Sequence, residues 1–278
     1  MGKQKVIWAN DARHYHGFVH EPPISELDAV MPVDEVAGVG VDIFVYMVAR
    51  ADGLFYPSDV GQRWPNGERS MTHGAGDTFN LAAEWRVDQN LRSLEQRGLD
   101  PLKMLINRAH EHGMQFVASL RVMAYYGTDA AVAYAAPPDG IGFADPKIRA
   151  AQLAVVTELA AAYDSDGVEL DLSGAPGGAS MAFRPEDRTA MTPVMTVWVE
   201  AACAAVHGAP MDSASTVPRK ICGARCYPTL EMNIAAGYDI PAWIAAGVDY
   251  LVPMCCESTT TDALSIRLRW NLLVCPSL

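Results

Sequence analysis

Short apolar runs alternate along the chain with longer stretches in which apolar positions recur every three or four residues. Apolar runs of about four to eight residues predict strands, and the longer spacing predicts amphipathic helices that bury one face. The predicted strands are residues 6–9, 41–48, 115–122, 167–172, 221–226 and 248–254. The predicted helices are residues 84–97, 101–112, 146–163, 196–206, 230–235 and 241–246.

The order of strands and helices predicts parallel strand–helix–strand units, which build either a doubly wound sheet or a barrel. Strands of a doubly wound sheet are buried on both faces and consist of continuous apolar runs. Two predicted strands alternate instead. In one, Ser119 and Arg121 share a side, and in the other Glu169 and Asp171 do, because side chains reverse direction at each residue. This pattern favours a barrel with polar sides inward and apolar sides against outer helices.

We therefore predict a (β/α)8 TIM-type barrel, formed by a single domain over residues 1–278 with a long polar loop at about 50–80. No Gly-x-Gly-x-x-Gly turn follows the first strand, which argues against a dinucleotide-binding fold. A complete barrel has eight strands, whereas the pattern yields only about six. The final residues, 267–278, do not resemble a closing strand and helix. We expect a barrel that is incomplete at its C-terminal end.

Composition narrows the function classes. Half of the 278 residues are hydrophobic, which suffices for a packed core. The formal net charge of −12 repels phosphate backbones, so we expect no nucleic-acid partner. No apolar run reaches the roughly 18 residues of a membrane span, and no signal peptide is visible before the first strand, so we predict a cytoplasmic protein without a membrane partner. Composition leaves the oligomeric state open.

The cysteines indicate neither a disulfide scaffold nor a metal site. All 6 lie in the C-terminal third of the chain, and we expect reduced thiols packed as small apolar side chains. Cys222, Cys226 and the adjacent Cys255 and Cys256 match no regular zinc module. We predict no metal and no cofactor.

The richest candidate for chemistry is the acidic end of the fourth predicted strand, because barrel active sites form at the C-terminal ends of strands. Asp171 lies nearest the mouth and is the predicted acid or base, with Glu169 in support. Glycosidic cleavage needs two carboxylates on opposite sides of the bond, which two residues of one strand cannot provide. The partner must come from another strand, with Glu257 as the first candidate and Asp11 as the second.

Arginines and aromatic residues near the strand ends complete the predicted site. Arg121 and Arg225 either neutralise the carboxylates, which we favour, or bind an anionic substrate group such as a uronate. Aromatic rings can stack on sugar faces; we assign Trp64 in the long loop to that role and expect core packing for Trp8. The predicted substrate contacts are Arg121, Arg225, Tyr46, Trp64, Asp11 and Asn10.

An alternative hypothesis rests on His14 and His16, shortly after the first strand. A His-x-His pair is typical of metal-dependent hydrolase barrels when it lies on the strand end itself. Here residues 10–13 intervene, so exposed loop histidines are the default expectation.

Several motifs resemble those of a group of bacterial glycoside-hydrolase-like barrel proteins. The matching segments are residues 98–102, 108–114, 118–121, 144–146, 163–171, 229–231, 236–239 and 248–253, including the run Asp-Gly-Val-Glu-Leu-Asp. The resemblance covers the chain as far as the sixth strand and implies a (β/α)8 fold with a hydrolytic role on carbohydrate.

The leading hypothesis is therefore a glycoside hydrolase that cleaves an oligo- or polysaccharide by carboxylate acid/base chemistry. One alternative is a non-catalytic carbohydrate-binding barrel, or a truncated and inactive one. The other is a metal-dependent hydrolase that uses His14 and His16. The sequence does not give the sugar, the linkage or the stereochemical outcome.

Overall fold

A six-stranded parallel sheet organises the part of the chain that the computed structural model describes, namely residues 5–12, 19–50, 53–63, 78–122, 142–173, 187–210 and 219–254. The strand order is β1-β2-β5-β6-β7-β8, and all five neighbouring pairs are parallel. The strands are β1 (Ile7–Asn10), β2 (Ile43–Met47), β5 (Gln115–Arg121), β6 (Gly167–Asp171), β7 (Ile221–Cys226) and β8 (Tyr250–Pro253).

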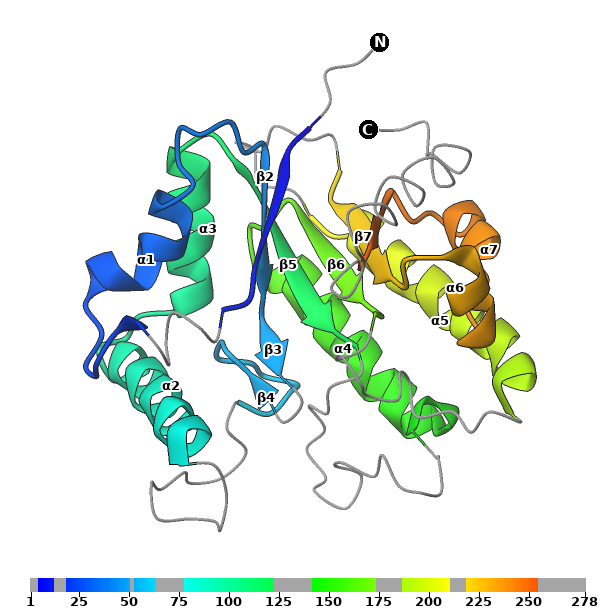
Figure 1. The fold of residues 1–278 in the computed structure, drawn as a ribbon, viewed down its shortest axis with the longest axis horizontal. Helices are drawn as coiled ribbons and strands as arrows, with labels where there is room; N and C mark the ends of the chain where they lie inside the picture. The colour runs from blue at the N-terminus through cyan, green and yellow to red at the C-terminus, as the bar shows by residue number, and fades with distance from the viewer. Residues whose placement is uncertain are drawn as a thin grey trace.

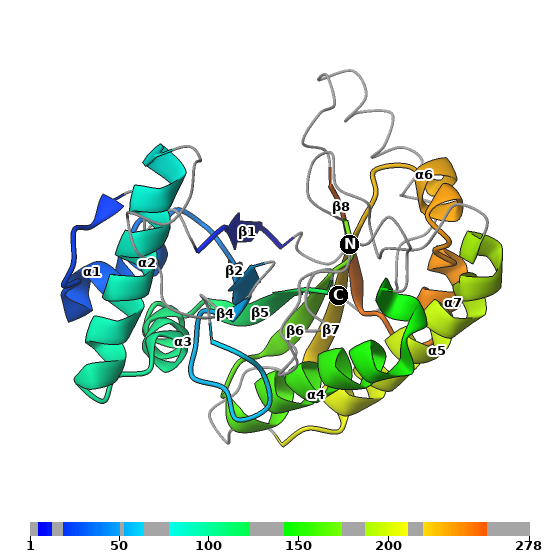
Figure 2. The ribbon, with the colours of Figure 1, turned by 90° about the horizontal axis from the view of Figure 1, so that it is seen from below.

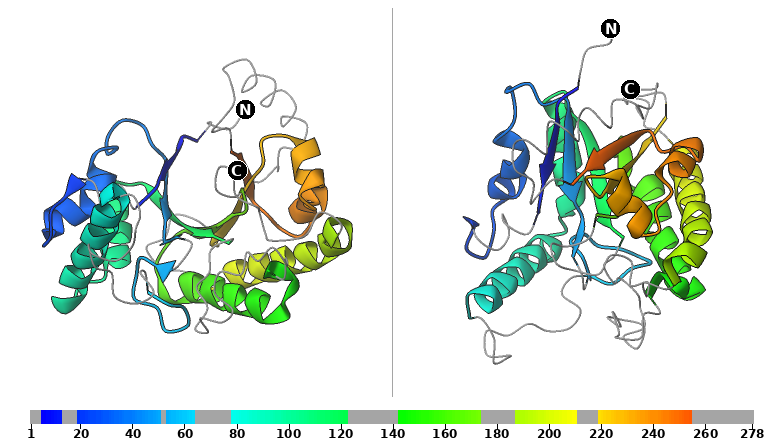
Figure 3. Two further views of the ribbon diagram at one scale, coloured as in Figure 1. Left: turned by 60° about the horizontal axis from the view of Figure 1, so that its bottom comes forward. Right: turned by 45° about the vertical axis from the view of Figure 1, so that its right-hand side comes forward.

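The sheet curls into an arc with its helices on the convex side (Figures 1 and 2). The left panel of Figure 3 shows the same open curvature. Strands β1 and β8 are the two edges of the described sheet. The architecture is a partial barrel, and the eightfold closure of the predicted fold is not reached by the described strands. The helices are α1 (Glu26–Asp34), α2 (Thr78–Gln96), α3 (Pro101–Glu111), α4 (Pro146–Ala162), α5 (Arg188–His207), α6 (Leu230–Ala235) and α7 (Ile240–Ala245).

The predicted elements are confirmed in order, with two additions. The pattern did not predict α1 or the short antiparallel pair β3 (Ala49–Arg50) and β4 (Gly53–Leu54), which occupies part of the predicted loop. In addition, α2 and α5 begin earlier than expected. Helix α1 contains a proline at Pro32, which lowers helix propensity, but Ser25 caps it by accepting a hydrogen bond from Asp28 N.

Apolar side chains fill both sides of the sheet at different levels. Most of the core lies between sheet and helices, where Phe116, Leu120 and Leu170 are fully buried. A smaller cluster on the inner face, near the N-terminal ends of the strands, forms a floor beneath the polar residues. Its members are Ile43, Val45 and Val117, with Ile221 packed against them.

Three aspartates lock the strands together at their N-terminal ends. Asp42, Asp166 and Asp249 each directly precede a strand. Each accepts a hydrogen bond of 2.8 Å from a backbone N–H that lies in the neighbouring strand or directly before it. His110 and His207, in the last turns of α3 and α5, contact Asp166 and Asp249 at 2.9 Å. These contacts fix the register at the end of the sheet opposite the candidate site. The backbone donors are Val6, Phe116 and Cys222.

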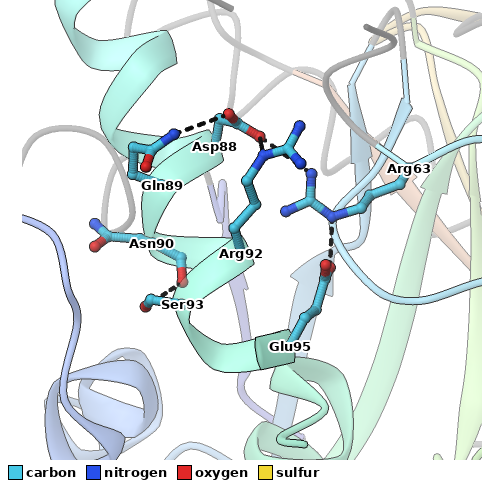
Figure 4. A network of polar contacts seen from close by, with 7 residues as sticks. All are labelled: Arg63, Asp88, Gln89, Asn90, Arg92, Ser93 and Glu95. Carbon is cyan, nitrogen blue, oxygen red and sulfur yellow. Dashed lines mark hydrogen bonds and ion pairs between the residues drawn. The ribbon is translucent and has the colours of Figure 1, made fainter. Parts of the chain in front are cut away.

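Ion pairs attach the segment after β4 to helix α2 (Figure 4). Arg63 donates through Nε to Glu95 at 2.5 Å and through Nη1 to Asp88 at 3.2 Å. Arg92 also donates to Asp88, at 2.7 Å, so this buried carboxylate faces two guanidinium groups. The network fixes the chain directly after β4 against helix α2.

Helix α5 is the one helix in the described ranges with the length and hydropathy of a membrane span. Its side chains Trp198, Val199 and Cys203 are buried in the core, and the helix packs against α4 and β7. We therefore describe it as part of the helical shell.

Candidate functional site

The inner face of β6 carries the two acidic residues predicted from its alternation. Glu169 is fully buried and is held by side chains from the strands on both sides. Its Oε1 accepts from Ser119 Oγ on β5 at 2.8 Å and from Arg225 on β7, with Nε at 3.0 Å and Nη2 at 2.9 Å. The structure thus selects Arg225, of the two predicted arginines, as the partner of Glu169.

Tyr250 on β8 reaches Glu169 across an intervening strand. Its hydroxyl donates to Oε2 of Glu169 at 3.3 Å. The ring passes over Gly223 of β7, where a Cβ atom would lie only 2.1 Å from Tyr250 Cζ. Only a glycine therefore leaves room for this contact. Sequence reasoning named neither residue as part of a site, although the strand alternation places both on the inner face.

Asp171, at the C-terminal end of β6, is held by a separate set of donors. Oδ2 accepts from Arg121 Nε at 3.3 Å, and Oδ1 accepts from Ser173 Oγ at 2.6 Å and from the Ser173 backbone N–H at 3.2 Å. The Asp171 side chain is also fully buried. Ser173 was another residue that sequence reasoning missed; its signal is the short side chain two residues after an aspartate, which is typical of such turns.

The inner layer consists of Glu169, Asp171, Arg121 and Arg225, and its two negative and two positive charges are balanced. Burial raises the pKa of Glu169 above its usual value, the charge of Arg225 opposes that shift, and the charge of Asp171 adds to it. The two carboxylates of β6 lie between Arg121 on β5 and Arg225 on β7. In register, Asp171 lies between Arg121 and Arg225. The arginines therefore neutralise the acids, as the sequence favoured.

Other predicted contacts lie away from this layer. Tyr46 packs against Phe44 and Phe116 in the core on the helix side of the sheet, so a ligand on the inner face would not touch it. Asn10 is paired in register with Tyr46 and shares that side. Trp8, expected in the core, is 48% exposed because β1 is an edge strand of the described sheet.

Asp11 follows β1, which is separated from β6 by β2 and β5. Its charge raises the pKa of Tyr46, in addition to the larger effect of burial, so the Asp11 carboxylate lies near that ring. It is therefore placed with Tyr46, three strands from Asp171.

The remaining predicted residues lie outside the described residues. These are Glu257, Trp64, His14 and His16, and also Cys255 and Cys256, which match no zinc module. Within the described ranges, no group of three or more His, Cys, Asp or Glu side chains is arranged to hold a metal ion.

No protein-family model matches the chain, and no curated protein matches it. Among solved structures, it is similar to the PgaB (BpsB) glycoside hydrolase domain from Bordetella bronchiseptica, with a TM-score of 0.57 at 13% identity over 96% of this chain and 81% of that one. The fold is a partial (β/α) barrel, similar to the barrel of that domain. An alpha-amylase from Lactobacillus plantarum gives a TM-score of 0.50 at 12% identity over 97% of this chain and 59% of its own.

The partial barrel spans only part of some neighbours. It covers 45% of GH5_18 from Streptomyces cattleya, with 81% of this chain aligned at 15% identity and a TM-score of 0.44. The likeness to the PgaB domain and to the Lactobacillus amylase, at 13% and 12% identity, establishes the fold alone.

Proposed function

We propose that the protein is a glycoside hydrolase in which Asp171 is the reacting carboxylate and Glu169 positions the layer around it. The observation that carries this proposal is the place of Asp171, on the inner face at the C-terminal end of a parallel strand, with an arginine at the same level on each side. Active sites of such barrels form at that end of the strands.

The hydrogen bonds of the two acids support this division of roles. Oε1 of Glu169 accepts from two neighbouring side chains and Oε2 from a third, all on the inner face. Asp171 ends its strand, and two of its three donor contacts come from Ser173 in the segment that follows. Asp171 is thus held mainly from the residue that follows its strand, whereas Glu169 is held between strands.

The second carboxylate must come from another strand, because residues two apart on β6 cannot lie on both sides of a glycosidic bond. Glu257, shortly after β8, remains the predicted partner. A separation of about 5 Å from Asp171 would fit retaining chemistry, and about 6.5–9.5 Å inverting chemistry.

The test is hydrolysis of a mixed panel of α- and β-linked oligosaccharides by the full chain, followed as the release of reducing ends. We expect Asp171→Asn to lower the rate at least about 100-fold, as for loss of a general acid or base, with binding of the same glycan retained. The matched control is Asp34→Asn, which removes a carboxylate paired with Arg108 far from β6 and leaves the rate unchanged. Equal rates for Asp171→Asn and wild type would refute the assignment.

A second candidate is a carbohydrate-binding barrel without catalysis. The observation that favours it is that both inner carboxylates are fully buried and paired with arginines. Binding of a panel glycan by wild type without hydrolysis would select this function. Loss of hydrolysis on chelation would instead favour the metal-dependent alternative through His14 and His16.

A further inference from the structure

Two thiols from different elements meet in the core beside β7. Cys203 on α5 and Cys222 on β7 are 19 residues apart in sequence, and their Sγ atoms are 3.4 Å apart. Both side chains are fully buried and reduced. At this distance the two thiols are hydrogen-bonded, and a disulfide bond of about 2.05 Å requires the sulfurs to approach each other by roughly 1.3 Å.

We propose that Cys203 and Cys222 form an intramolecular disulfide when the protein meets a small oxidant of the peroxide class, joining helix α5 to strand β7. This modification site is independent of the glycosidase proposal, since both side chains lie on the helix side of the sheet. The strand that the disulfide would join to α5 nevertheless carries part of the candidate site. Gly223 directly follows Cys222, and Arg225 lies two residues further along β7.

The chemistry balances with hydrogen peroxide. One thiolate attacks a peroxide oxygen, the O–O bond breaks, and hydroxide leaves and takes up the proton that the thiol released, giving water and a sulfenic acid. The second sulfur attacks the first, the S–O bond breaks and a second water leaves. Two thiols and one peroxide thus give one disulfide and two waters.

Charged groups lie beside the sulfur pair. Arg219 is within electrostatic range of both thiols and donates to Asp249, whose Oδ2 accepts from the Cys222 backbone N–H. His207, one helical turn after Cys203, contacts the same carboxylate. Arg219 has 43% and His207 22% of the side chain exposed. The cationic Arg219 favours a thiolate, and Arg219 and His207 connect the buried pair to the surface.

The setting also predicts that the reaction is slow. The hydrogen bond between the Cys222 and Cys203 thiols, together with burial, raises the pKa of the Cys222 thiol well above its usual value. The thiol is therefore protonated at neutral pH, and oxidation depends on brief opening between α5 and β7.

The experiment treats the full chain with hydrogen peroxide, blocks remaining thiols under denaturing conditions and maps the peptides by mass spectrometry. We expect a Cys203–Cys222 linked peptide that reducing agent releases, and a Tm raised by about 5 °C, as for closure of a loop of this length. The matched control is Cys226→Ser, which removes the other buried thiol of β7 and should leave the linked peptide unchanged.

Two further results decide the matter. Cys203→Ala should abolish both the link and the oxidant-dependent rise in Tm; should that variant not fold, the peptide map of the wild type still decides. Recovery of both cysteines as blocked thiols after exposure that oxidises a free dithiol would overturn the proposal, as would a link from either one to Cys226. Neither readout depends on glycan hydrolysis, so this proposal and the proposed function can fail separately.

Discussion

Replacing Arg225 by methionine tests whether the buried charges of the inner layer stabilise one another. The substitution keeps an apolar stem but removes the guanidinium that contacts Glu169 at 3.0 and 2.9 Å. Breaking a buried ion pair from one side costs about 3–5 kcal/mol, because the remaining charge is left without compensation. Ser119 and Tyr250 still donate to Glu169, so we expect the lower end, about 3 kcal/mol.

The assay is urea unfolding followed by circular dichroism at several pH values. Burial already raises the pKa of Glu169, and loss of Arg225 raises it further. A carboxyl group with a folded-state pKa above its unfolded value binds a proton more tightly when folded, so the native state gains stability as pH falls through that pKa. The loss in the free energy of unfolding caused by Arg225→Met, which we call its deficit, should therefore be largest at neutral pH and shrink on acidification.

Two controls separate burial from contact distance. Arg108→Met removes a guanidinium that lies 2.6 Å from Asp34 at the surface, with side chains 33% and 27% exposed. Despite the shorter contact, its loss should be the smaller of the two, because exposed ion pairs are screened by water. The double variant Glu169→Gln, Arg225→Met should be less destabilised than Arg225→Met alone. A deficit for Arg225→Met that is no larger than that of Arg108→Met, or that grows on acidification, would refute the reasoning.

Two other predictions concern single positions. Gly223→Ala places a Cβ about 2.1 Å from the Tyr250 ring and should cost about 1–3 kcal/mol in urea unfolding, while Gly208→Ala, where the closest heavy atom is at 3.1 Å, should cost less. Burial raises the pKa of Asp249, but hydrogen bonds from Arg219 and the Cys222 backbone outweigh it, so the folded-state pKa lies below the unfolded value. Asp249→Asn should therefore lower stability at pH values above about 4, and by less below about pH 4, as acid titration of unfolding will show.

The inner face of β6 could be predicted because strand alternation is a local rule. Glu169 and Asp171 are two residues apart, so they must share a side, and their apolar neighbours assign that side to the interior. The partner of each acid could not be predicted, because it depends on register between strands far apart in sequence. Arg121 and Arg225 both lie level with Asp171, and only the conformations of their side chains decide that Arg225 turns to Glu169.

Tyr46 shows where the same rule gives no answer. Every residue of β2 is apolar or aromatic and buried, so its sequence does not show which side chains face inward and which face the helices. The register with β5 assigns the two faces. Tyr46 is level with Ala118, on the helix side, and Met47 is level with Ser119, on the inner side. Tyr250 was missed for a different reason: its role depends on a glycine in the adjacent strand, which is visible only once the two are paired.

The aspartates that precede β2, β6 and β8 hold the strands in alignment at one end of the sheet, while the loops at the candidate site lie at the other end. They set how the strands align from the end where Asp42, Asp166 and Asp249 bind neighbouring backbone amides. Loops at the opposite end take no part in these bonds. Insertions and substitutions there can accordingly diversify ligand recognition while strand alignment is preserved, which makes this chain a suitable scaffold for exchanging loop sequences.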